Sequence, residues 1–389
     1  MRKIIYGKGL IDGTGDVTND NVSIIVKGAK IIGIEKNKKV QSQQEDIVID
    51  LPGDYLLPGF IDSHSHGPIR PGDGDQVGQF MDPSAIAALR SANNLRRSLK
   101  SGVTTMRSMH AENDLDVFLR ESVEKQEIPG PRMFISAGAI TPSNGLGAFT
   151  SVDTPDDIRR SIRRSIKMGA DFIKIFCDPG NYSKDEIKLA VDEAHNKGKR
   201  ISAHVLSEKE FQMCVECGVD SIEHGGPVSN NTLEMMKKKG IFWVATNTIF
   251  FHPQGLPRAN YQINAPGTRR AKIEQTLVPK ACEGIAKAFP KAISAKVDIA
   301  LGSDSMHGLF PYEMEYMVEK GATPMEAIIA ATRKGAELIG VEEQIGTLEV
   351  GKKADIISVP GNPLDDIRLT WDVNLIMKDG KRYDNLSSL

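Results

Sequence analysis

The chain has 389 residues, of which 40% are hydrophobic, and this length exceeds the usual span of one small domain. Its 49 lysine and arginine residues face 51 acidic residues, so no basic excess is present to hold a nucleic-acid backbone. Four cysteines cannot form a disulfide framework, and no apolar run approaches the roughly 20 residues that cross a bilayer or the length of a signal peptide. We therefore expect a soluble cytoplasmic protein that binds neither nucleic acid nor membranes.

Both ends of the chain have the composition of short strands. Residues 3–51 contain the β-branched runs "NVSIIVKG", "KIIGIEKN" and "DIVIDLPG", separated by turn signals, which predict a small antiparallel β unit. The far end repeats this texture in "GTLEVGKKADIISVPG" and "NLIMKDGKRY", after a helical run at 323–340. Because chain termini often lie close together, we predict one small β-sandwich domain built from residues 1–57 and 345–389.

Strand-like and helix-like segments alternate through residues 58–344. The eight strand-like segments are, in chain order, "GFIDSHSH", "GVTTMRSM", "RMFISAGA", "DFIKIF", "RISAHV", "SIEH", "FWVAT" and "DIALGSDS". Most are followed by amphipathic stretches such as "DEIKLAVDEAHNKGK", where Ile187, Val191 and Ala194 fall at helical spacing. Eight such alternations over about 280 residues predict an α/β fold of the (β/α)8 TIM-like barrel type. The alternative is a doubly wound sheet, but "HSHGPIRPGDG" after the first strand lacks the expected GxGxxG turn.

Metal-capable residues lie in or at the ends of five of these segments, where a barrel carries its chemistry. They are His64 and His66 in the first, Lys174 in the fourth, His204 in the fifth, His224 in the sixth and Asp304 in the eighth. A lone histidine at a strand end is more often a hydrogen-bonded structural residue, so the argument depends on their joint occurrence. In the His-x-His pair both side chains share one face of the strand and can therefore chelate one cation.

The motifs "FIDSHSH", "GADFIKIF", "SAHV", "SIEHG" and "LGSDS", with the closing "GTLEVGKKADIISVPGNPL", resemble those of the amidohydrolase superfamily. The resemblance covers nearly the whole chain and is strongest to the imidazolonepropionase-like and prolidase-like branch, whose fourth strand carries a carboxylated lysine. It implies a binuclear metal centre. The implied ligands are His64, His66 and Asp304 on one divalent ion, His204 and His224 on the other, and Lys174 as a bridge that carries carbon dioxide as a carbamate.

Elementary electrostatics agrees with this implied role of Lys174. Burial near positive charge lowers the pKa of a lysine and exposes a neutral amine that can react with carbon dioxide. The alternative is a lysine that snorkels from a barrel strand to solvent. Imidazole and carboxylate ligands favour zinc, although they also take manganese, cobalt or iron.

The resemblance implies an enzyme that cleaves a carbon–nitrogen bond of a small molecule, amide, lactam or peptide-like, by attack of a metal-bridging hydroxide. Asp304 is the implied catalytic residue, first as general base and then as general acid. Three alternatives are a Xaa-Pro dipeptidase-like or N-acyl amino acid hydrolase, a mononuclear deaminase that would not need the strand-four lysine, and a non-catalytic scaffold. The sequence leaves the oligomeric state open, a homo-oligomer included.

Substrate contacts are expected where the sequence departs from prolidase-like relatives. "TPSNGLG" has Leu146 where those relatives carry a histidine, and "TNTIFF" has Phe250 in place of a tyrosine. Two polar side chains that could contact the substrate are therefore missing. These changes favour a less polar amide, a lactam or a cyclic imide over a substrate held by its carboxylate. His307 and His110 follow the eighth and second strands and are further candidates for substrate contact. Other anchors for a carboxylate are Arg70, Arg107, Arg258 and His252.

A CxxC motif, Cys214 and Cys217, lies in "FQMCVECGVD". With no second cysteine pair and a helical pattern around it, the motif predicts small buried residues on a helix rather than a zinc or redox site.

Overall fold

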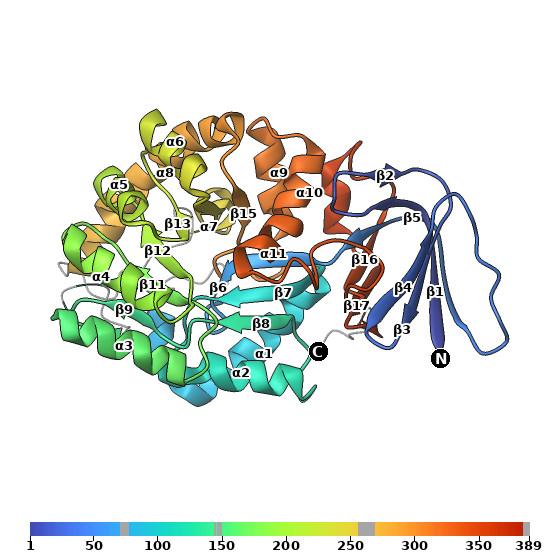
Figure 1. The fold of residues 1–389 in the computed structure, drawn as a ribbon, viewed down its shortest axis with the longest axis horizontal. Coiled ribbons are helices and arrows are strands. Elements are labelled where there is room, and N and C mark those ends of the chain that lie inside the picture. The colour runs from blue at the N-terminus through green and yellow to red at the C-terminus, as the bar shows by residue number, and fades with distance from the viewer. Residues whose placement is uncertain (71–77, 144, 146–149, 256–268, 384–389) are drawn as a thin grey trace.

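The computed structural model describes residues 1–70, 78–143, 145, 150–255 and 269–383 (Figure 1). Parallel strands and helices form the larger part of the molecule, and a second sheet lies at one end. That second sheet combines the first and last strands of the chain, which appear blue and red beside each other in Figure 1. None of the helices among the described residues is long and apolar enough to span a membrane.

The terminal sheet has eight strands in the order β18-β17-β16-β5-β1-β3-β4, with β2 paired to β1. They are β1 (Arg2–Ile11), β2 (Val17–Thr18), β3 (Val22–Lys27), β4 (Lys30–Glu35), β5 (Ile47–Pro58), β16 (Ile356–Pro360), β17 (Leu375–Lys378) and β18 (Lys381–Arg382). The antiparallel pair β5–β16 joins the two ends of the chain, with Leu57 opposite Ile357. Strands from residues 1–57 and 345–389 therefore share one hydrogen-bonded sheet, as the composition of both ends predicts.

One pairing in this sheet differs from expectation. β1 and β5 run parallel, with Ile5 opposite Ile49, so the prediction of a purely antiparallel unit is wrong for this pair. β3 already occupies one edge of β1, so β5 joins the other edge after residues 36–46 have carried the chain back across the sheet. The direction of β5 depends on this long connection, which local sequence patterns do not report.

Each of the eight predicted central segments contains a strand, and all of these strands pair in parallel. They are β6 (Phe60–Ser65), β7 (Val103–Ser108), β8 (Arg132–Ile135), β11 (Ile173–Phe176), β12 (Ile201–Val205), β13 (Ser221–His224), β14 (Phe242–Ala245) and β15 (Ile299–Leu301). Parallel pairing puts their carboxyl ends on one side. The candidate histidines and Asp304 lie at or just after these ends, whereas Lys174 is the second residue of β11.

The third segment is interrupted, contrary to the sequence prediction. Ala137 and Gly138 have positive φ angles of 50° and 129°, which end β8 and start β9 (Ala139–Thr141) in a new direction. β8 pairs with β7, whereas β9 pairs with β11 and with β10 (Thr150–Ser151). The parallel strands therefore divide into a three-stranded sheet, β6-β7-β8, and a seven-stranded sheet, β10-β9-β11-β12-β13-β14-β15.

Backbone hydrogen bonds connect these two sheets along both of their meeting edges. The N–H of Asp171, just before β11, donates to the carbonyl of Ile135 in β8 at 2.8 Å. At the other edge the N–H of Asp304, just after β15, donates to the carbonyl of His64 in β6 at 2.8 Å. The second bond brings the first and the eighth predicted strands together at their carboxyl ends.

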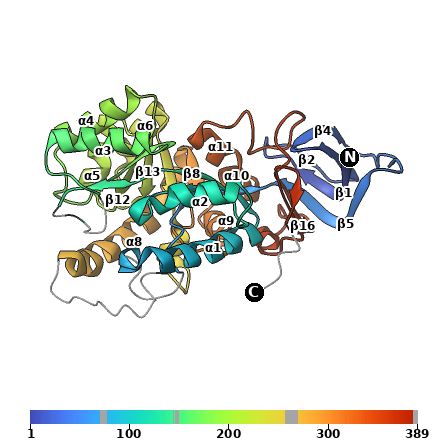
Figure 2. The same ribbon diagram turned by 90° about the horizontal axis from the view of Figure 1, so that it is seen from below.

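Helices follow most of the central strands (Figures 1 and 2). They are α1 (Ser84–Lys100), α2 (Leu115–Glu124), α3 (Pro155–Lys167), α4 (Lys184–His195), α5 (Glu208–Cys217), α6 (Asn230–Lys239), α7 (Asn247–Phe251), α8 (Arg269–Ala295), α9 (Pro311–Glu319), α10 (Pro324–Ala330) and α11 (Arg333–Ile339). A capping box of Ser183 and Glu186 starts α4, and its apolar face is buried as its spacing predicts. Cys214 and Cys217 are buried free thiols of α5, as the helical pattern around them indicates.

Candidate metal centre

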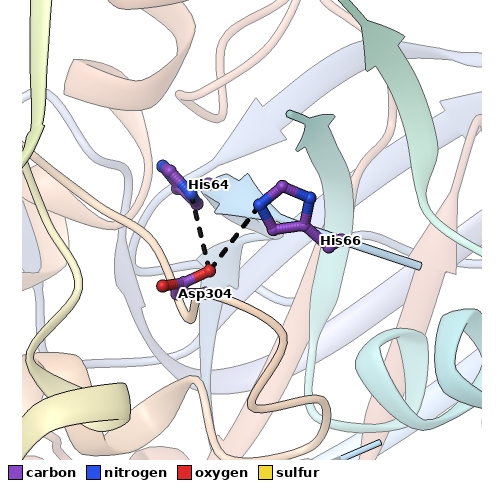
Figure 3. Close-up of side chains that lie close together, drawn as sticks. All are labelled: His64, His66 and Asp304. Carbon is purple, nitrogen blue, oxygen red and sulfur yellow. Dashed lines mark ion pairs between the residues drawn. The ribbon is translucent and has the colours of Figure 1, made fainter. Parts of the chain in front are cut away.

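Three metal-capable side chains converge where β6 and β15 end (Figure 3). Oδ1 of Asp304 lies 3.5 Å from Nε2 of His64 and 3.8 Å from Nε2 of His66. One ligand atom from each residue lies within 4.8 Å of the other two, which is the separation expected of atoms that share one cation. These are the residues that the sequence motifs assign to a first metal ion.

The backbone brings Asp304 close to the histidine pair. Gly302 packs against β6 so closely that a Cβ there would lie 2.5 Å from Cβ of His64, so only glycine fits. Asp304 then takes a left-handed conformation, with φ of 45°, which is uncommon outside glycine and is held here by its hydrogen bond to His64. Burial raises the pKa of the Asp304 carboxyl to about 7.

Hydrogen bonds decide which nitrogens of the histidine pair remain for a metal. Nδ1 of His64 donates to Oε2 of Glu223 at 2.7 Å, and Nδ1 of His66 donates to the carbonyl of His110 at 3.0 Å. In both rings Nε2 is left with its lone pair toward Asp304. Burial lowers the pKa of His66 to about 3 and that of His64 well below its usual value, so both rings are in the neutral, ligating form.

Glu223 is a functional residue that the sequence motifs did not single out. This buried carboxylate accepts hydrogen bonds from Arg107, from Ser202 at 2.7 Å and from Ser221 at 2.6 Å, in addition to the one from His64. Burial acts to raise its pKa, but the charges of Arg107 and Lys174, together with the hydrogen bonds from the two serines, lower the pKa below its ordinary value. The ionised carboxylate fixes the orientation of His64.

His224 lies at the end of β13, next to Glu223. Its φ of 66° breaks the alternation of the strand and lets consecutive side chains both reach the centre. Nδ1 of His224 forms a hydrogen bond with Oγ1 of Thr246 at 2.8 Å, and its ring centroid lies 4.5 Å from that of His64 and 4.6 Å from that of His204. The ring of His224 therefore lies between those of His64 and His204 and contacts both.

Lys174 is fully buried in β11, and its Nζ has no hydrogen-bond partner among the described residues. Burial lowers its pKa to about 8, against the opposing charges of Glu223 and Asp304. A snorkelling lysine would reach water, and this side chain does not. A buried amine without a hydrogen bond is costly, so the position points to a role beyond packing.

His204 ends β12 beside the loop that follows β11. Its ring stacks on Phe176, with centroids 4.7 Å apart and planes 30° apart. Its Nε2 lies 3.3 Å from Oδ1 of Asp178. The structure therefore brings His64, His66 and Asp304 together as one set, and the rings of His224 and His204 lie next to it.

Two of the predicted substrate contacts, His307 and His110, instead form contacts with the protein around His66. His307 is buried behind His66, where Nδ1 contacts Oγ of Ser98 at 2.9 Å and Nε2 donates to the carbonyl of His66 at 3.1 Å. With both nitrogens engaged by the protein, His307 supports the backbone of the His-x-His pair. His110 likewise supports His66 through its carbonyl, while its Nε2 contacts Glu112 at 3.0 Å.

Phe250 is buried in α7, with its ring edge-on to His224 at 6.0 Å between centroids. This places an apolar side chain beside His224. Arg107 is committed to Glu223, so it is not available as a carboxylate anchor. Leu146 and Arg258 lie outside the described residues, and Arg70 and His252 lie on exposed or partly exposed segments.

Known proteins with similar sequences and folds cover nearly the full chain. Ochratoxinase of Aspergillus niger is 27% identical over an alignment that spans 98% of this chain and 86% of that protein. Imidazolonepropionase of Fusobacterium nucleatum is 24% identical, over 87% of this chain and 86% of that protein. The structure of a Xaa-Pro dipeptidase with bound methionine in the active site has a TM-score of 0.83 and 26% identity, over 98% of this chain and 100% of that one. A prolidase complexed with N-methylphosphonate-L-proline has a TM-score of 0.87 and 26% identity, over 98% and 99%.

The sequence model of the amidohydrolase family matches residues 55–383. That span starts in β5, just before the His-x-His strand, and ends after β18, so it includes every residue of the centre described above. The chain therefore belongs to the amidohydrolase family of hydrolases.

Proposed function

We propose that this protein is a binuclear metal-dependent hydrolase of a carbon–nitrogen bond in a small molecule. His64, His66 and Asp304 would hold one divalent ion, His204 and His224 the other, and Lys174 would bridge them as a carbamate. The observation that carries the proposal is the fully buried Nζ of Lys174 in β11, which has no hydrogen bond among the described residues and lies only over the ring of Phe176. A mononuclear deaminase would give this buried amine no task.

The chemistry of the donor set fits two cations. Nε2 of His64 and Nζ of Lys174 are buried and without hydrogen bonds among the described residues, so the protein leaves them for a ligand. Burial lowers the pKa of Lys174 to about 8, which favours the neutral amine that can react with carbon dioxide. The resulting anion offsets positive charge, and the imidazole and carboxylate ligands favour zinc.

When bound, such ions lower the pKa of a coordinated water and polarise a substrate carbonyl. The residues of the chain supply the proton transfers and the orientation. Asp304 would accept the proton of the attacking water and deliver it to the leaving nitrogen. Glu223 keeps the ring of His64 in one orientation, and the apolar rings of Phe176 and Phe250 border the histidines and exclude water.

We also propose that the central strands form a closed barrel. The eight central strands, counted with β8 and β9 as two parts of the third, would close into a (β/α)8 barrel of residues 58–344. The hydrogen bonds from Asp171 to Ile135 and from Asp304 to His64 support closure at both edges. The terminal strands would form the separate β-sandwich domain of residues 1–57 and 345–389.

For the substrate, we infer a small amide, lactam or cyclic imide. Phe250 adds an apolar surface beside His224, and the nearby Arg107 is already paired with Glu223. A Xaa-Pro dipeptidase-like or N-acyl amino acid hydrolase is the second candidate, because a Xaa-Pro dipeptidase structure with bound methionine covers 98% of this chain.

A hydrolysis screen tests the function. Zinc-loaded protein is offered dipeptides, N-acyl amino acids, lactams and cyclic ureas, beside a chelator-treated sample and the variant Asp304→Asn. We expect turnover of one class by the loaded protein, and its loss both on chelation and in the variant, by about 100-fold or more for the variant, as for other positioned acid–base groups. A protein that binds the metals but turns over no class would support the non-catalytic scaffold instead.

A further inference from the structure

Three of the four histidines at the centre have one ring nitrogen held by the protein. Nδ1 is held by a carboxylate in His64, by a backbone carbonyl in His66 and by a hydroxyl in His224. In His64 and His66 the partner is an acceptor only, so the contact fixes the tautomer and leaves Nε2 for the metal. His204 is the exception, since neither of its ring nitrogens has a hydrogen bond among the described residues.

Asp178 lies next to that nitrogen. It follows β11 in a turn that Asn181 holds by donating its N–H to the carbonyl of Asp178 and its Nδ2 to the carbonyl of Phe176, both at 2.9 Å. Oδ1 of Asp178 lies 3.3 Å from Nε2 of His204, and neither carboxylate oxygen has a hydrogen bond in the described part of the chain. A buried carboxylate without partners is costly, so these two groups are each other's natural partners.

We propose that Asp178 is a positioning residue of the metal centre. It accepts a hydrogen bond from Nε2–H of His204, and this leaves Nδ1 as the nitrogen that binds the ion. His204 would then ligate through the opposite nitrogen from His64 and His66, whose Nε2 atoms face Asp304. The proposal rests on the two-metal centre proposed above and extends it to a residue outside the six ligands.

The stacked ring of Phe176 cannot replace Asp178 in this role. A stack holds the plane of the His204 ring, but it does not determine which of the two ring nitrogens carries the proton. A carboxylate at one edge distinguishes them, because an imidazole nitrogen that faces it is favoured as the protonated one.

Exposure argues against Asp178 as a direct substrate contact. Its side chain is 1% exposed, compared with 10% for His204 and 18% for Asp304. A substrate that approaches the centre meets the more exposed atoms first. Asp178 lies behind the ring of His204.

Two variants at Asp178 separate positioning from direct ligation. Asp178→Asn keeps an oxygen that can accept the hydrogen bond, whereas Asp178→Ala removes it. The matched control is Asp116→Asn, since Asp116 is an equally buried carboxylate whose hydrogen-bond donors are the N–H groups of Val117 and Ala137. Zinc affinity of each of the two sites is measured by competition with a chelator, and the His204 tautomer by nitrogen NMR of the metal-free protein.

We expect Asp178→Ala to weaken the second zinc by about 10–100-fold and to lose the Nε2–H tautomer of His204, while the first zinc is unchanged. Asp178→Asn should keep most of the affinity, and Asp116→Asn all of it. Wild-type zinc affinity in Asp178→Ala, or an equal loss in both Asp178 variants, would overturn the proposal. If the wild type binds a single zinc, the two-metal centre fails, whereas the tautomer in metal-free protein still reports on Asp178.

Discussion

Lys174→Ala is expected to abolish metal-dependent turnover, with kcat/KM lower by on the order of 10³-fold, since several kcal/mol of metal-based stabilisation depend on the bridge. The variant loses the only amine at the centre that is fully buried and without a hydrogen bond among the described residues. Kinetics on the substrate found in the screen, together with metal content per chain, measure the effect. Added formate, acetate or propionate should partly restore turnover by occupying the space of the missing carbamate.

Lys378→Ala is the matched control for this experiment. Lys378, in β17 of the terminal sheet, is also a buried lysine, and burial also lowers its pKa to about 8. Its Nζ, however, donates a hydrogen bond to the carbonyl of Gly130 at 2.6 Å. Its loss should reduce stability and leave metal content unchanged. Full wild-type rates in Lys174→Ala without added carboxylate would refute the bridging role.

Glu223→Ala is expected to lower the free energy of unfolding of the metal-free protein by about 3–5 kcal/mol, the usual cost of leaving one partner of a buried ion pair alone. The exposed fraction of the Glu223 side chain is 0% and that of Arg107 is 4%, so water cannot compensate the guanidinium. Denaturant unfolding of chelator-treated protein measures the change without a contribution from bound metal.

A double variant separates stability from orientation of the ligand. Arg107→Met with Glu223→Gln removes both charges, so most of the lost stability should return. Zinc binding through His64 should stay weakened, because a neutral amide holds Nδ1 less firmly than a carboxylate does. A loss of less than about 1 kcal/mol in Glu223→Ala would mean that the buried pair is not the support described here.

The central strands were predictable from the sequence because each is a short apolar run with turn signals on both sides. Their break at Ala137 was not, since alanine carries no signal for a φ of 50°. Glu223 was missed for a related reason. A regular strand sends Glu223 and His224 to opposite faces, and only the left-handed conformation of His224 brings both to the centre.

Pairings between distant segments were the other feature that the sequence did not predict. The parallel pair β1–β5 and the contact of His307 with the carbonyl of His66 depend on how residues far apart in the chain meet. Local periodicity reports a strand or a histidine but not its partner. The rule that barrel sites form at carboxyl ends of strands supplied that missing information for His64, His66 and Asp304, which the structure brings together.

The most direct test of the central claim is the metal content of the protein combined with the intact mass of the chain. Purified protein is reconstituted with zinc in the presence of bicarbonate, freed of loosely bound metal, and measured by elemental analysis and native mass spectrometry. The two-metal centre predicts near two zinc ions per chain and the added mass of one carbon dioxide on Lys174. One zinc ion per chain with an unmodified Lys174 would contradict it.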